Sequence, residues 1–197
     1  MDPLAKYIKD ASPDIIGFQE VRFDSGVVAE DGPYEMKHLI DRLPKYTHYV
    51  WQPAHSYFDP QNLHSWVEEG AAIFSKFPIL STDYLLLPRF LNDEDDRQHQ
   101  RACLHARIVT PKHGEVDVFT VHLSLSKTAR DKSVRALWEY IRTNATTNTA
   151  ILFAAEKIEV LGLDASEETR GEPGHGMLDG NSPMWASDHR AVMLTLV

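Results

Sequence analysis

Three segments that are far apart along the chain place chemically useful side chains at the ends of apolar runs. Glu20 ends the first run, and a carboxylate held at the end of a rigid strand is a good oxygen ligand for Mg²⁺ or Mn²⁺. His122 ends another run, where a charged imidazole can donate a hydrogen bond to a phosphoryl oxygen. Asp188 and His189 stand together before the last run. Taken singly, each has a simpler explanation: a solvent-facing carboxylate, a buried structural histidine or a chance pairing.

The rest of the sequence offers few alternative chemistries. It contains no Gly-x-Gly-x-x-Gly, phosphate loop or Gly-x-Ser-x-Gly elbow, which argues against nucleotide cofactors and a serine hydrolase. Its single cysteine, Cys103, excludes a disulfide framework and a Cys-based zinc finger. The remaining histidines lack zinc-binding spacing, and we interpret them as surface or loop residues. They are His38, His48, His55, His64, His99, His105, His113 and His175.

The composition is that of an acidic globular protein. The 197 residues are 43% hydrophobic and 25% charged, with a net charge of −9, and no break in composition divides them, so we expect a single domain over 1–197. The acidic balance argues against tight, non-specific binding of duplex nucleic acid. It leaves a phosphate substrate open, because a cation bound by carboxylates attracts phosphate. The absence of a visible signal peptide or long apolar run favours the cytoplasm or nucleus.

The chain alternates between strand-like and helix-like patterns, which places the candidate residues at strand ends. We predict an α/β domain of the α+β type, built as a two-layer β-sandwich flanked by helices, with loops over 56–69, 92–100 and 164–183. The predicted helices cover 2–11, 34–43 and 126–143. The predicted strands cover 14–21, 46–52, 71–75, 79–87, 102–110, 116–123, 149–153, 157–161 and 191–197.

Four motifs in a fixed order resemble the endonuclease/exonuclease/phosphatase superfamily, which has the DNase-I-like fold. The segment Asp14-Ile-Ile-Gly-Phe-Gln-Glu-Val21 is similar to the family's D-I-I-x-x-Q-E-V, and Glu69-Gly-Ala-Ala-Ile-Phe-Ser-Lys-Phe-Pro-Ile79 to its E-G-x-A-I-x-S-x-x-P-I. Thr120-Val-His-Leu123 resembles its x-T-H-L strand end, and Ser187-Asp-His-Arg-Ala-Val192 resembles its closing S-D-H-x-x-V.

The resemblance implies Mg²⁺- or Mn²⁺-assisted in-line hydrolysis of a phosphate ester. It implies that Glu20 is a metal ligand and that His189 activates water or contacts the scissile phosphate. It also implies that Asp188 is an acidic companion in or near the metal shell. His122 would stabilise the phosphoryl charge. Two interpretations of Arg101 stay open: it helps to hold phosphate, or it is a surface residue. The family's substrates include nucleic acids, inositol phosphates and lipid head groups, and the loops choose among them.

Two family features are missing from this sequence. The first is a metal-binding Asn on a strand ahead of the helix over 2–11. The second is Gly-Asp-x-Asn, for which we expect an internal deletion near 144–149; such a loss would leave unpaired backbone in a sheet. The expected form is therefore an incomplete DNase-I-like fold. Two functions stay open: a phosphodiesterase, nuclease or phosphatase, and a catalytically dead isoform or scaffold-only binding protein. An unrelated α/β binding protein would require four ordered matches by accident.

Overall fold

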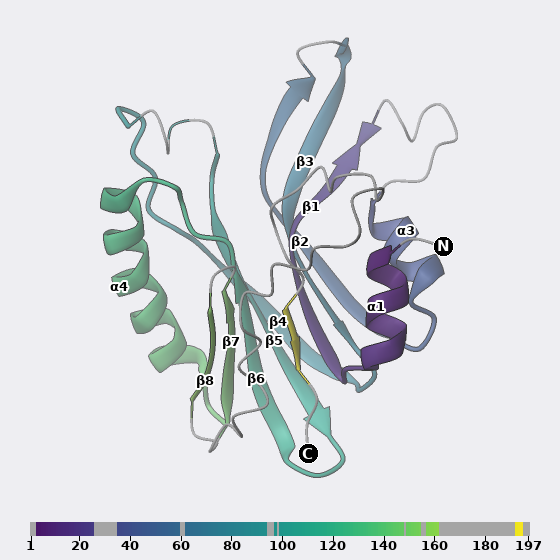
Figure 1. The fold of residues 1–197 in the computed structure, drawn as a ribbon. Coiled ribbons are helices and arrows are strands. Elements are labelled where there is room, and N and C mark those ends of the chain that lie inside the picture. The colour runs from purple at the N-terminus through teal and green to yellow at the C-terminus, as the bar shows by residue number, and fades with distance from the viewer. Residues whose placement is uncertain are drawn as a thin grey trace, which may run out of the picture.

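The computed structural model describes residues 3–25, 35–59, 62–93, 97, 99–147, 149–154, 157–161 and 192–194. Two β-sheets pack face to face in this part of the chain, with helices on their outer sides (Figure 1). This arrangement confirms the predicted two-layer sandwich flanked by helices. The helices are α1 (Pro3–Ala11), α3 (Glu35–Arg42) and α4 (Lys127–Asn144), and the strands are β1 (Ile15–Asp24), β2 (His48–Asp59), β3 (Asn62–Ser75), β4 (Ile79–Leu86), β5 (Ala102–Thr110), β6 (Gly114–Val121), β7 (Ala150–Ala154), β8 (Lys157–Leu161) and β9 (Val192–Leu194).

The two sheets have the orders β2-β3-β1-β9 and β4-β5-β6-β7-β8. Neighbouring strands are antiparallel except for β6 and β7, which run parallel and are joined through α4. A parallel pair needs such a crossover because the chain must return to the same end of the sheet. The hairpin between β5 and β6 turns at Pro111–His113, and Gly114 then takes a φ of 67° that suits glycine.

The main core lies between the sheets. Ile15 and Ile73 of the first sheet meet Leu104, Val118 and Phe153 of the second, and all five are almost fully buried. The next residue of β1, Ile16, points to the opposite face and packs beneath α1 and α3. Strand β1 is therefore buried on both faces, which explains its continuous apolar run.

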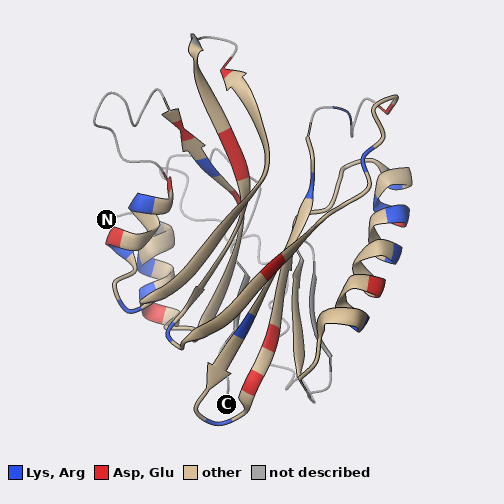
Figure 2. Cartoon of the chain, turned by 180° about the vertical axis from the view of Figure 1, so that it is seen from behind, with Lys and Arg blue, Asp and Glu red and all other residues tan. Residues whose placement is uncertain are grey.

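The helices cover the outer faces with apolar stripes. Helix α1 buries Ile8 and α3 buries Met36 against the first sheet. Helix α4 packs Leu137 and Ile141 against the second sheet and begins at Ser126, whose Oγ accepts a hydrogen bond from the Ala129 amide. Lys and Arg recur along α4, whereas several strands carry Asp and Glu (Figure 2). Among the helices that the structure describes, none combines the length and apolar character needed to span a membrane.

The prediction of a loop over 56–69 is wrong. Strands β2 and β3 continue through this region as a long antiparallel hairpin, in which Tyr57 lies opposite Val67 and Phe58 lies opposite Trp66. The polar residues and prolines of the segment suggested a loop. Cross-strand pairs of aromatic and β-branched side chains stabilise the extended form instead, and Pro53 is tolerated because β2 is an edge strand.

The segment around 144–149 returns the chain from α4 directly to the sheet. Asp117 of β6 accepts hydrogen bonds from the backbone amides of Thr146 and Thr147, each at 2.9 Å. Strand β7 then pairs with β6 from Asp117↔Ala150 to Val121↔Ala154, so β6 has a partner on each edge. The pairing of β7 with β6 leaves no gap in the sheet beside β6, where the expected deletion would have left unpaired backbone.

The interpretation of His105 as a surface or loop residue is also wrong. His105 lies inside β5 and is buried, with its ring stacked on Phe119 at 4.4 Å between centroids. Its Nε2 donates to Oδ1 of Asp117 at 2.8 Å, and Arg107 Nε donates to the same oxygen at 3.1 Å. With the amides of Thr146 and Thr147, the fully buried carboxylate of Asp117 accepts four hydrogen bonds. Hydrogen bonds of this kind stabilise a charge that is buried away from water.

Candidate functional site

Two β-bulges on either side of β3 build the site. In β1, Gln19 and Glu20 together oppose the single residue Ala71, and Glu20 takes a left-handed φ of 55°. In β2, Ala54 is the extra residue between the pairs Pro53↔Gly70 and His55↔Glu69. Bulges re-aim the side chains beside them and are frequent near functional sites. Here they turn Glu20 and His55 toward one pocket.

Gly70 allows β2 to approach β3 closely beside the bulge at Ala54. A Cβ built on Gly70 would lie 2.0 Å from the carbonyl oxygen of Gln52, so no other residue fits without backbone movement. The Glu-Gly pair of the second sequence motif therefore has a steric cause: the backbone of β2 approaches β3 too closely for a side chain.

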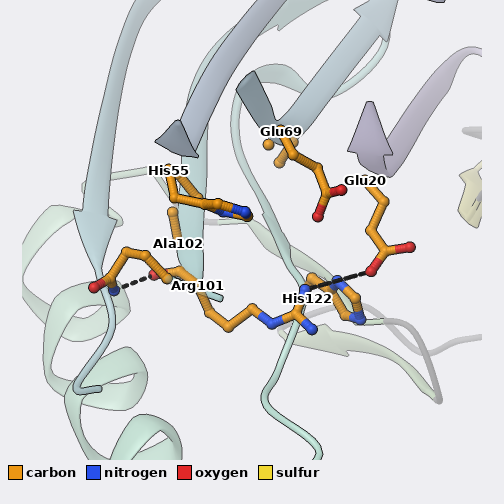
Figure 3. Close-up of a pocket in the computed structure, with 10 residues that line it drawn as sticks. Glu20, His55, Glu69, Arg101, Ala102 and His122 are labelled. Atoms are coloured by element: carbon orange, nitrogen blue, oxygen red, sulfur yellow. Dashed lines mark hydrogen bonds and ion pairs between the residues drawn. The ribbon is translucent and has the colours of Figure 1, made fainter. Parts of the chain in front are cut away.

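Glu20, Arg101 and His122 meet in the pocket (Figure 3). Arg101 Nη1 lies 3.4 Å from Glu20 Oε1 and 2.6 Å from His122 Nδ1, and His122 Nδ1 lies 3.3 Å from Glu20 Oε1. Arg101 directly precedes β5 and His122 directly follows β6, and the pairing Cys103↔Val121 puts these strand ends side by side. The sandwich then brings Glu20 of the first sheet against them.

Arg101 also selects the tautomer of the His122 ring. A guanidinium can only donate, so at 2.6 Å the His122 Nδ1 must accept, and the ring proton of the neutral imidazole resides on Nε2. All three side chains are largely buried, with exposed fractions of 12% for Arg101, 26% for Glu20 and 10% for His122. In such surroundings a charge is held by its partners rather than by water.

Gln19, the neighbour of Glu20, ties the two sheets together behind the pocket. Its Nε2 donates to Thr120 Oγ1 at 3.1 Å, a buried contact between residues 101 positions apart. Gly17 keeps the sheets close at this point, since a Cβ there would lie 2.7 Å from the ring of Phe153. Gln19 therefore holds the two sheets in register, whereas Glu20 faces the pocket.

The structure brings together three of the residues predicted from sequence: Glu20, Arg101 and His122. The other two, Asp188 and His189, lie outside the described residues. Their assigned roles, as a metal-shell carboxylate and a water-activating histidine, stay predictions. The same is true of the single-domain extent over 1–197.

Sequence reasoning missed a second group in the same region, formed by His55, Glu69 and His99. Their ligand atoms all lie within 4.8 Å of one another. His55 lies in β2 rather than in a loop, whereas His99 lies in the connecting segment before β5, as predicted. His55 and Glu69 are directly opposite in the β2–β3 ladder and line the pocket with Glu20. Burial lowers the pKa of His55, and His99 lowers it further, so its imidazole is neutral at pH 7. The sequence does not reveal this group because His55 and Glu69 become neighbours only through the register of the β2–β3 hairpin.

The pocket offers hard oxygen donors of the kind that Mg²⁺ binds. Glu20 supplies one carboxylate, and Glu69 lines the same pocket (Figure 3). Mg²⁺ is held in many sites by one or two carboxylates, with waters and substrate phosphates completing its shell. The donor chemistry of the described residues therefore fits such an ion.

The comparisons with known proteins agree with the motifs. The profile of the Endonuclease/Exonuclease/phosphatase family matches residues 1–154. The chain belongs to this family, whose activities all cleave phosphoester bonds and which generally uses a divalent metal ion. No curated protein sequence matches the chain.

Solved structures show the same fold. The chain is similar to an endonuclease/exonuclease/phosphatase from Beutenbergia cavernae (18% identity, TM-score 0.59, covering 75% of this chain and 39% of that one). It is also similar to a family protein from Leptotrichia buccalis (18%, 0.55, covering 77% and 57%). A third similar structure is the human Nocturnin catalytic domain with bound sulfate (15%, 0.50, covering 76% and 53%). The chain thus spans roughly two-fifths to three-fifths of the length of these relatives.

Proposed function

We propose that this chain is a phosphoester hydrolase that depends on Mg²⁺ or Mn²⁺, with Glu20 as a metal ligand and with Arg101 and His122 holding the phosphate. The observation that carries the proposal is the convergence of a carboxylate, a guanidinium and an imidazole in one pocket from two different sheets. Asp188 as a second metal ligand and His189 as the group that activates water complete the proposed set.

The proposal gives each described residue a distinct task, and the contacts between the side chains support it. The guanidinium of Arg101 offers several N–H donors, and phosphate oxygens are its preferred acceptors. Because Arg101 occupies Nδ1 of His122, the proton on Nε2 is the one that His122 can donate to a phosphoryl oxygen. Arg101 thereby acts both on the substrate and as the group that sets the tautomer of His122.

A divalent ion, when bound, would polarise a phosphoryl oxygen and stabilise the leaving oxygen. Glu20 is the described residue that would hold it. Nucleic acids, inositol phosphates and lipid head groups are the proposed substrate classes, because all of them present the phosphate ester that this set would bind.

The test is hydrolysis of bis(p-nitrophenyl) phosphate by the metal-free chain after Mg²⁺ or Mn²⁺ is added back. We expect metal-dependent hydrolysis, with Glu20→Gln, His122→Gln and His189→Ala each lowering kcat/KM by at least about 100-fold. Glu139→Gln, an exposed acid on α4, is the matched control and should retain full activity. Hydrolysis that survives Glu20→Gln and His122→Gln would contradict the proposal.

A second candidate function is phosphate binding without catalysis. The sequence favours it in one respect: the 197 residues contain no Gly-Asp-x-Asn, and groups that act as a catalytic unit lose most of the rate when one is removed. A folded chain that binds inorganic phosphate in calorimetry, loses that binding in Arg101→Ala and hydrolyses no ester would support this alternative.

A further inference from the structure

The group formed by His55, Glu69 and His99 lies beside the cluster that the proposed function uses, and the proposed function employs neither of its two imidazoles. His55 comes from β2, Glu69 from β3 and His99 from the segment that leads into β5, so the group bridges the two sheets. The bulge at Ala54 and the pairing His55↔Glu69 fix the first two side chains on one side of the hairpin. The proposed function gives no reason for the β2 bulge, whereas a ligand shared by His55 and Glu69 would.

The imidazoles of this group have buried nitrogen atoms whose hydrogen-bonding capacity is not filled. Both ring nitrogens of His55 and Nδ1 of His99 are shielded from solvent, and none of the three makes a hydrogen bond of good geometry in the described part of the chain. The backbone of Gln100 makes a weaker hydrogen-bonding contact with the His55 ring. Buried polar atoms in native proteins are nearly always satisfied, and an unsatisfied one calls for a ligand or ion. Even with the Gln100 backbone beside one nitrogen of His55, its other ring nitrogen and Nδ1 of His99 have no partner among the described residues.

Packing holds the two rings in place. The ring of Tyr57 stacks on His55 with centroids 5.5 Å apart, and His99 meets His55 edge to face at 5.3 Å. Because aromatic contacts restrict both imidazoles, their nitrogens are positioned before any ligand arrives. Preorganised donors are what a metal site requires.

The dimensions suit a small metal ion. Three atoms no more than 4.8 Å apart lie at most about 2.8 Å from a common centre, whereas Zn²⁺ sits about 2.0–2.1 Å from nitrogen and oxygen ligands. Each side chain would have to move by less than about 1 Å to reach bonding distance. The adjoining pocket, which His55 and Glu69 line, has a volume of about 20 Å³, which is room for an ion or a single water molecule.

We propose that His55, Glu69 and His99 form a separate site for one divalent transition-metal ion of the Zn²⁺ class. Two imidazoles and one carboxylate form a ligand set that favours zinc and its neighbours over Mg²⁺, which takes oxygen ligands. Three protein ligands leave a fourth position open, and His55 and Glu69 line the pocket that also holds Glu20, Arg101 and His122. The inference is independent of the proposed hydrolysis, since it concerns binding of the ion alone.

The test uses Co²⁺ as a probe of the metal-free full chain, because Co²⁺ replaces Zn²⁺ and absorbs visible light when bound by nitrogen and oxygen ligands at low coordination number. We expect saturable absorption and a Co²⁺ affinity that falls by at least about 100-fold in His99→Gln, since changes even outside the ligand shell cost 10–100-fold. Glu69→Gln and His55→Gln should give the same loss. His48→Gln, the same substitution elsewhere in β2, is the matched control and should bind like the parent chain.

His99→Gln is the most informative variant, because His99 lies in a connecting segment and its substitution leaves the strands of both sheets unchanged. Circular dichroism checks that each variant is folded. Equal Co²⁺ affinity in His99→Gln and His48→Gln would overturn the proposal, as would a folded parent chain without saturable absorption. Glu20→Gln should retain Co²⁺ binding. Loss of binding in Glu20→Gln equal to that in His99→Gln would show a single shared site and overturn the separate one. No substrate is present, so a failure of hydrolysis leaves this result unaffected.

Discussion

Replacing Asp117 by alanine should destabilise the protein more than most single substitutions. Asp117 is fully buried and accepts from His105 and Arg107 on one oxygen and from the amides of Thr146 and Thr147 on the other. Removing one partner of a buried charged network costs about 3–5 kcal/mol, because the remaining groups stay buried and unpaired. For a chain of this length that loss corresponds to a fall in Tm of roughly 6–20 °C.

The assay is urea unfolding at neutral pH, with Asp131→Ala as the control because Asp131 is an exposed acid on α4. The control should change the free energy of unfolding by less than about 1 kcal/mol. A double-mutant cycle with Arg107→Met would then separate the contribution of the Arg107 pair from that of the Thr146 and Thr147 amides. A loss below about 1 kcal/mol in Asp117→Ala would refute the view that this carboxylate anchors the turn into β7.

The same carboxylate predicts an acid dependence of stability. Burial tends to raise the pKa of Asp117, but hydrogen bonds from Thr147, His105 and Arg107 outweigh it and hold the pKa below its ordinary value of 3.8. The unfolded chain therefore binds this proton first as the pH falls. The stabilising contribution is complete above about pH 5 and is lost as the pH falls through the lower folded pKa, with a slope of up to about 1.4 kcal/mol per pH unit. Asp117→Asn should lack this part of the slope when unfolding is measured from pH 5 to pH 2.

Three further predictions concern the bulges and the core. Gly70→Ala should lower the free energy of unfolding in urea by at least about 2 kcal/mol, because its Cβ would meet the Gln52 carbonyl. Gly114→Ala, in open space at a left-handed φ, should lower it by only about 1 kcal/mol. Equal losses in the two variants would contradict the steric argument. Glu20→Gly should be more stable than Glu20→Ala by about 1 kcal/mol, since only glycine relieves the left-handed φ, and the reverse order would contradict backbone strain at the bulge. Burial raises the pKa of the Cys103 thiol, so a thiol-specific reagent should label the folded chain only at its unfolding rate; rapid labelling of the native chain would disprove the buried position.

The sequence alone determined the family, the sandwich and part of the site. The four ordered motifs identified the family, and the apolar runs located most strands because burial imposes a local pattern that a single chain displays. Glu20, Arg101 and His122 could be singled out since each stands at the end or beginning of such a run. These properties depend on residues near one another in the sequence.

Pairing between distant residues decided the rest. The β2–β3 hairpin escaped prediction because its polar and aromatic residues become strand-like only when Phe58 faces Trp66 across the ladder. The bulges at Glu20 and Ala54 arise from the register against Gly70, and neither strand encodes that register alone. His55, Glu69 and His99 are unremarkable in the sequence and become a potential metal site only when the hairpin and the two sheets close around them, because ligand geometry depends on distances in space.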